Sequence, residues 1–153
     1  MSIAFEKPTL LDIPEMQSIV KKEIEAGIIL NRTDDEVATN IRSYTLAKDG
    51  DKIVGFCALH IYSMNLAEIR SIVVHEDYRG QAIGNRLIDV VLKEAKKLNL
   101  SQVLSLTYQK RFFEKLGFKE IEKESIPEHK IWADCIKCTH FPKCDEISMI
   151  KDI

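Results

Sequence analysis

The stretch that decides the fold is residues 66–87, LAEIRSIVVHEDYRGQAIGNRL. Its first half is rich in β-branched residues, which favour a buried strand, and its second half begins an apolar pattern at helical spacing that continues to Asn99. Between them, residues 79–84 bring an arginine and two glycines to the expected helix start. Backbone N–H groups there lack intrahelical partners, and the helix dipole is positive. The junction therefore predicts a site for a phosphate-bearing ligand.

A structural interpretation competes with this one, because Gly80 and Gly84 would also permit a tight turn and Arg79 would then be a solvated surface residue. The rest of the chain supplies context for the choice. Periodicity and turn residues predict further strands at 3–6, 44–48, 52–62, 102–106, from 118 and at 146–151, with helices at 13–26, after Thr33 and at 110–116. Residues 66–106 should form a right-handed parallel crossover, and ligands collect at the carboxyl ends of such strands.

Composition limits the classes of function. The 153 residues, 45% of them apolar, fit one domain over residues 1–153 with a single core. A net charge of -2 gives no general attraction to nucleic acid or to an anionic membrane. The N-terminus lacks the basic and apolar blocks of a signal peptide, and no apolar stretch is long enough to span a bilayer. We therefore expect a cytoplasmic protein with reduced or metal-bound cysteines.

A second motif lies in residues 127–145, before the last predicted strand. Its soft ligands have the spacing Cys-x2-Cys-x-His-x3-Cys and are Cys135, Cys138, His140 and Cys144. They would suffice for one tetrahedral zinc ion. The ligands are packed into ten residues rather than two separated knuckles, so we favour a cap of buried thiols with Trp132 and no metal. The segment could also close the amine pocket or form a homodimer contact.

The order strand, HEDYRGQAIGNRL, long helix, strand, FFEKLGF resembles the GNAT superfamily of N-acetyltransferases over nearly the whole chain. The resemblance implies a mixed α/β (α+β) fold. Its central sheet has six to seven mostly antiparallel strands, is splayed at a parallel pair and carries helices on both faces. The family's loop motif corresponds here to residues 79–84, with Ala82 where glycine is usual.

The resemblance further implies that acetyl-CoA is the cosubstrate. The pantetheine arm would lie along the main chain of the strand ending at residue 74, and the pyrophosphate would rest on the loop amides. The implied cofactor-binding residues are Ile72, Val73, Val74, Arg79, Gly80, Gln81, Ala82, Ile83, Gly84 and Asn85. The alternative for residues 72–74 is that they only fill the core, and backbone contacts with a ligand are compatible with that.

Acetyl transfer requires a neutral amine, so a nearby carboxylate is useful as a base. Glu68 occupies the position of the family's catalytic glutamate, although a solvated glutamate on an edge strand is the alternative. Many members supply an acid from a Phe-Tyr pair, whereas this chain has Phe112 and Phe113, so the expected hydroxyl at Phe113 is missing. Tyr108 is the substitute that we predict, with a packed aromatic as the alternative of equal weight.

GIILNRTDDEV, AEIRSIVV, SLTYQKRFFEKLGF and the terminal WADCIKC resemble the short, stand-alone N-acetylglutamate synthases of bacterial arginine biosynthesis. This implies L-glutamate as the amine substrate, with Arg32 and Thr107 in the family's substrate-binding positions. Arg70 joins them because it lies two residues from the predicted base, while Lys110 and Arg111 are further charges nearby. Each of these cations could instead be solvated.

Two departures leave other functions open. Tyr108 stands where the larger synthases have a substrate-binding arginine, so another small amine or a protein amine is an alternative acceptor. The missing hydroxyl and Ala82 also allow a catalytically idle module that binds acyl-CoA.

Overall fold

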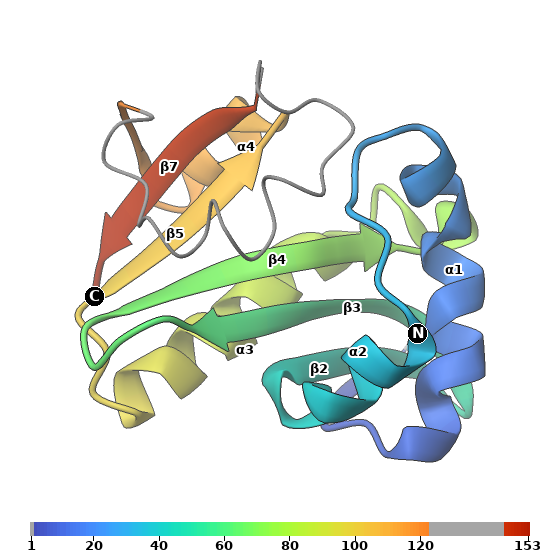
Figure 1. The fold of residues 1–153 in the computed structure, drawn as a ribbon. Coiled ribbons are helices and arrows are strands. Elements are labelled where there is room, and N and C mark those ends of the chain that lie inside the picture. The colour runs from blue at the N-terminus through green and yellow to red at the C-terminus, as the bar shows by residue number, and fades with distance from the viewer. Residues whose placement is uncertain (1, 123–145) are drawn as a thin grey trace.

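The computed structural model describes residues 2–122 and 146–153, and within these ranges seven strands form one sheet (Figure 1). The elements in chain order are β1 (Ile3–Glu6), α1 (Ile13–Glu25), α2 (Asp34–Thr39), β2 (Tyr44–Asp49), β3 (Lys52–Ile61), β4 (Leu66–Val74), α3 (Ile83–Lys97), β5 (Gln102–Thr107), α4 (Lys110–Lys115), β6 (Lys119–Ile121) and β7 (Ile147–Asp152). Short 3-10 turns precede α1, β2 and α3, the last being η3 (Glu76–Tyr78).

The sheet is splayed at its centre. Its order is β1-β2-β3-β4-β5-β7-β6, and the pair β4 and β5 is parallel while the other neighbours are antiparallel. In the described chain, the ladder between β4 and β5 ends at the pair Glu68 and Leu104, although β4 continues to Val74. Figure 1 shows the two strands running apart beyond that point. The predicted fold class is confirmed.

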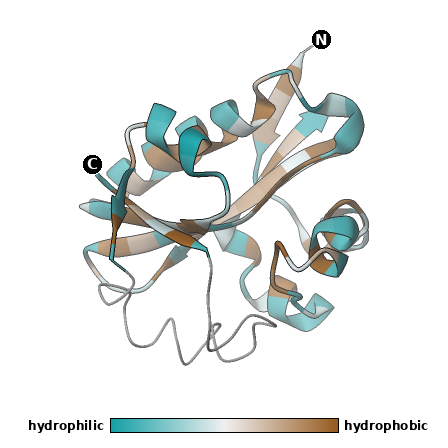
Figure 2. Cartoon of the chain, turned by 90° about the horizontal axis from the view of Figure 1, so that it is seen from above, coloured by the Kyte–Doolittle hydropathy of each residue, from teal (hydrophilic) through white to brown (hydrophobic). Residues whose placement is uncertain are grey.

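Apolar side chains fill both faces of the sheet. On one face the buried stripe of α3, which includes Leu87 and Val91, packs on residues of β3 and β4. On the other, Met16 and Val20 of α1 pack with Val37 of α2 on the opposite side chains of β2 and β3. In Figure 2 the hydrophobic strands lie between helices whose outer faces are hydrophilic. Burial on both sides explains why β3 is buried almost continuously rather than in alternation.

Local signals fix the helix ends. Thr33 and Glu36 form a capping box at the start of α2, each side chain accepting the other's backbone N–H at 3.1 Å. At the end of α3, Asn99 adopts a φ of 63° and stops the helix. Leu98, the residue that follows α3, is about half exposed and lies outside the buried stripe of the helix. Among the described residues, no helix combines the length and apolarity needed to cross a bilayer.

A β-bulge in β4 was not predicted. Phe56 of β3 faces Val73 and Ala58 faces Arg70, so two residues of β4 oppose Cys57 alone. Ser71, at the bulge, has a φ of 58°, which is uncommon for a residue other than glycine. Bulges bend a strand and redirect its side chains. The alternation of side chains along β4 therefore breaks at Ser71.

The thiol of Cys57 is fully buried in the core, and this burial raises its pKa to about 12. The thiolate is the reactive form, so native Cys57 should be inert. We expect iodoacetamide at pH 8 to leave the Cys57 peptide unmodified in the native protein and to alkylate it in urea, as measured by mass spectrometry. Equal alkylation in both conditions would show that Cys57 is accessible.

Candidate active site

A cleft of about 800 Å³ lies where β4 and β5 separate. One wall is the second half of β4, the opposite wall is the end of β5 with the start of α4, and the loop joining α1 to α2 closes one side. The loop before α3 forms one end. Its charged and hydroxyl-bearing lining includes Glu23, Arg32, Glu68, Arg70, Ser71, Tyr78, Arg79, Ser105, Thr107, Tyr108 and Glu146. The predicted catalytic and substrate-binding side chains thus come together.

Glu68 lies at the point where the strands part, as the last β4 residue paired with β5. It is 2% exposed and lines the cleft, which excludes the alternative of a solvated edge-strand glutamate. Its Oε1 accepts a hydrogen bond from the Tyr62 hydroxyl at 2.6 Å. A buried carboxylate requires such a donor, because removing a charge from water without hydrogen bonds is costly.

The predicted substrate-binding residues reach the cleft from three elements. Arg32 is only 9% exposed and lies in the α1–α2 loop, where Gln17 Nε2 donates to its carbonyl at 2.9 Å. Arg70 projects from β4, and the buried Thr107 closes β5 and accepts the Gln109 backbone N–H at 2.8 Å. Tyr108 follows and is 37% exposed.

Two further cations behave differently. Lys110 forms an ion pair with Glu120 at 2.8 Å, which raises the pKa of the lysine. Neither Lys110 nor Arg111 is among the residues that line the cleft. The structure therefore separates the four candidate cations into Arg32 and Arg70 at the cleft and these two outside it.

The loop before α3 has the form of an anion site. Gly80 and Ala82 have positive φ values of 82° and 60°, so the chain turns sharply before the first helical residue, Ile83. Ala82 carries no side-chain cap for the helix, and the cleft is lined by residues 82–85 of this first turn. A helix N-terminus facing a cleft is suited to a phosphate group. Gln81 lies in the same loop but does not line the cleft.

Arg79 is held by two contacts within the protein. Its Nη2 lies 2.5 Å from Glu23 Oε1 of α1, and its Nε donates to the Val74 carbonyl at 3.1 Å. The Val74 carbonyl, predicted to pair with pantetheine, is thus already a hydrogen-bond acceptor. A second ion pair ties α1 to the loop, since Lys22 Nζ lies 3.0 Å from Glu76 and lowers the pKa of that carboxyl.

Comparison with known proteins identifies the family. A sequence model of the acetyltransferase (GNAT) domain matches residues 40–120, which is more than half of the chain. The chain belongs to the GNAT acetyltransferase family. It is also 35% identical, over 94% of its length, to an uncharacterised N-acetyltransferase of Chlorobaculum tepidum, 92% of which is covered.

Other relatives are larger proteins that contain a GNAT region. An amino-acid acetyltransferase of Pasteurella multocida is 28% identical over 80% of this chain, which spans 28% of that protein. Among solved structures, N-acetylglutamate synthase from Neisseria gonorrhoeae, complexed with coenzyme A and N-acetyl-glutamate, superposes with a TM-score of 0.88 at 18% identity. It covers 99% of this chain, which spans 35% of that synthase. At this identity the likeness supports the GNAT fold alone.

Ala82, the departure from the GNAT loop motif, has a structural consequence as well as the predicted effect on ligand approach. Its φ of 60° is left-handed, which costs an L-residue about 1–2 kcal/mol and costs glycine almost nothing. We expect Ala82→Gly to raise the free energy of unfolding by up to about 1 kcal/mol after the greater chain entropy of glycine is deducted. Chemical denaturation measures the change.

The matched control for that substitution is Ala38→Gly in α2. Ala38 is helical, so the same atomic change should destabilise the protein there by about 1 kcal/mol. A loss of stability on Ala82→Gly equal to that of the control would contradict the strain at residue 82.

The Phe-Phe pair of α4 divides between core and cleft. Phe113 is 1% exposed and packs edge-to-face on Phe118, with ring centroids 5.1 Å apart. Phe112 is the member that lines the cleft, where its ring would lie 3.5 Å from a side chain added at Gly84. The missing hydroxyl that the sequence interpretation located at Phe113 would therefore have pointed into the core.

Sequence reasoning missed several residues of the site. Tyr62 and Glu23 carried no local signal, because each reaches its partner through the tertiary fold. Among the described residues, no three His, Cys, Asp or Glu side chains gather in a geometry suited to a metal ion. The four predicted zinc ligands, Cys135, Cys138, His140 and Cys144, lie outside the described residues.

Proposed function

We propose that this GNAT acetyltransferase transfers the acetyl group of acetyl-CoA to the α-amine of L-glutamate, the reaction of an N-acetylglutamate synthase and the first step of bacterial arginine biosynthesis. The observation that carries the proposal is the composition of the cleft. It combines a buried carboxylate, Glu68, with the cations Arg32 and Arg70, and it ends at an anion-suited helix start. The names of the larger relatives, which are amino-acid acetyltransferases, support the same substrate class.

The donor would bind in the gap between β4 and β5. Its pyrophosphate would accept hydrogen bonds from the amides of residues 80–85, and Arg79 would add a charge-assisted contact. Its pantetheine amides would pair with the main chain at Ile72 and Val74. These two residues lie beyond the point where the ladder between β4 and β5 ends. Arg79 would then give up its hydrogen bond to the Val74 carbonyl and contact the ligand instead.

The acceptor would bind beside the thioester. Glutamate brings two carboxylates into a partly dry cleft, and Arg32 and Arg70 supply matching charges. Thr107, at the end of β5, would supply a polar contact. The α-amine would then face Glu68.

The chemistry would proceed by direct transfer in a ternary complex. Glu68 takes a proton from the ammonium group, directly or through one water, and the neutral nitrogen attacks the thioester carbonyl. A new C–N bond forms as the C–S bond breaks, and coenzyme A leaves as a thiolate. Tyr108 is the proposed donor of a proton to that sulfur. The acylated nitrogen loses its second proton, which returns to the Tyr108 oxygen, and Glu68 releases its own proton to solvent. The products are free coenzyme A and N-acetylglutamate.

Thiol release from acetyl-CoA, measured with a panel of amino acids, small amines and peptides, tests the proposal. We expect L-glutamate to give the highest kcat/KM. A higher value for another amine would overturn the acceptor and leave the acyl transfer intact. Thiol release with none of the panel, combined with calorimetric binding of coenzyme A, would support the idle module.

A further inference from the structure

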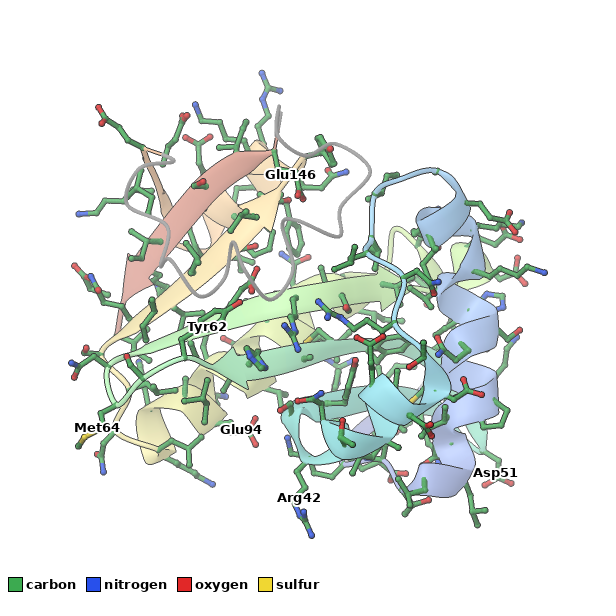
Figure 3. The ribbon with its side chains drawn as sticks, viewed as in Figure 1. Arg42, Asp51, Tyr62, Met64, Glu94 and Glu146 are labelled. Carbon is green, nitrogen blue, oxygen red and sulfur yellow. The ribbon has the colours of Figure 1, made fainter. Side chains whose placement is uncertain are left out.

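Tyr62 contacts the proposed base, Glu68, but does not itself line the cleft. Its hydroxyl donates to Glu68 Oε1 at 2.6 Å, a length typical of a charge-assisted O–H···O⁻ hydrogen bond. Figure 3 shows Tyr62 beside β4, on the side of the sheet that carries α1 and α2. Tyr62 is absent from the residues that line the cleft, and its hydroxyl connects it to the reaction through Glu68.

The position of Tyr62 is fixed by the turn that follows β3. Its backbone N–H donates to the Leu66 carbonyl at 2.9 Å, and the Ser63 N–H donates to the same carbonyl at 3.2 Å. Ser63 Oγ in turn accepts the N–H groups of Asn65 and Leu66. These hydrogen bonds fix the backbone of the turn. They thereby fix the position of the Tyr62 side chain, which lies only a few residues from the carboxylate that it contacts.

The ring itself is held by His60. The two rings meet edge-to-face with centroids 4.9 Å apart, and His60 is the direct cross-strand partner of Glu68 in the β3–β4 ladder. Edge-to-face packing restricts the rotation of a ring. His60 of β3 and Tyr62, just beyond the end of that strand, therefore support a carboxylate on β4 through packing and a hydrogen bond.

We propose that Tyr62 is a positioning residue that orients Glu68 for proton transfer. The inference rests on the proposed function, in which Glu68 is the base. A donor on one carboxylate oxygen limits rotation of the group and satisfies one of its acceptor oxygens in a site from which water is largely excluded. Loss of the donor makes the carboxylate harder to ionise.

The test is the pH dependence of kcat/KM for Tyr62→Phe. We expect the acid limb of the profile to move to higher pH, because the neutral acid gains stability relative to the carboxylate. Below that limb the rate should fall by about 10-fold, while the KM for acetyl-CoA stays unchanged. Tyr44→Phe is the matched control, since Tyr44 is a buried tyrosine in the cluster beneath α1, and its profile should match that of the parent.

A double-mutant cycle separates this inference from the proposed function. If Tyr62 acts through Glu68, Tyr62→Phe should have little further effect in a Glu68→Gln background. An acid limb that does not move in Tyr62→Phe would overturn the positioning role, even if the variant were less stable. The same holds if Tyr62→Phe lowers kcat/KM equally in the parent and in the Glu68→Gln background. An unimpaired Glu68→Gln single variant would instead overturn the base, and the proposed mechanism with it.

Discussion

Replacement of Glu68 with glutamine is expected to lower kcat/KM for acetyl transfer by about 10²- to 10⁴-fold near neutral pH. The change keeps the size of the side chain and can still accept the Tyr62 hydrogen bond, but it removes the group that takes the proton from the acceptor ammonium. The deficit should shrink as the pH rises, because the acceptor then loses its proton to solvent. Thiol release over a pH series measures both effects.

The matched control is Glu25→Gln at the end of α1, where the side chain is exposed and outside the cleft. This control should retain parental activity. Calorimetric binding of coenzyme A should be the same for parent, Glu68→Gln and control, since the nucleotide contacts are untouched. Turnover that is unchanged at every pH would exclude Glu68 as the base.

Replacement of Arg32 with alanine should raise the KM for glutamate by at least about 30-fold and leave the KM for acetyl-CoA nearly unchanged. Arg32 is 9% exposed, and truncating one partner of a buried, hydrogen-bonded charge pair costs about 2–5 kcal/mol. Arg32 would contact glutamate equally in the ground state and in the transition state, so kcat at saturating glutamate should fall little. Arg32→Lys should be intermediate, because lysine keeps the charge without the planar fork.

Arg42→Ala supplies the comparison for that experiment. Arg42 lies in the turn before β2, and Figure 3 shows its side chain pointing away from the protein. Its removal should change neither KM. If Arg32→Ala and Arg42→Ala give the same KM for glutamate, Arg32 does not bind the acceptor and the substrate assignment loses its main support.

The sequence was sufficient for features that depend on local physics. The strand at residues 66–74 and the helix start at Ile83 were predicted correctly, because β-branched residues, helical periodicity and the loop glycines all act over short ranges. The tight turn between β2 and β3 is also local in origin, with Gly50 at a φ of 62°. Glu68 and Arg32 were chosen from the family resemblance and Arg70 from its place two residues from Glu68, and the structure brings all three to one cleft.

Other features depend on contacts between distant segments and left no local trace. The bulge at Ser71 has no glycine to mark it, because packing against β3 holds the left-handed residue in place. The rotation of the short helix α4 could not be deduced either, since Phe112 and Phe113 are chemically identical and only the fold decides which one faces the cleft. The Glu23 contact with Arg79 spans 56 positions of the chain.

The parting of β4 from β5 creates two strand edges inside a sheet, on either side of the cleft. Open edges on a surface invite aggregation, but these are shielded by the protein's own helices and loops. A single extended ligand that carries amides, as pantetheine does, would complete the interrupted ladder. Recognition of this kind uses main-chain groups and does not depend on the side chains, so residues 72–74 can be replaced by other apolar residues during evolution. An insertion or deletion within these residues would shift every main-chain contact at once.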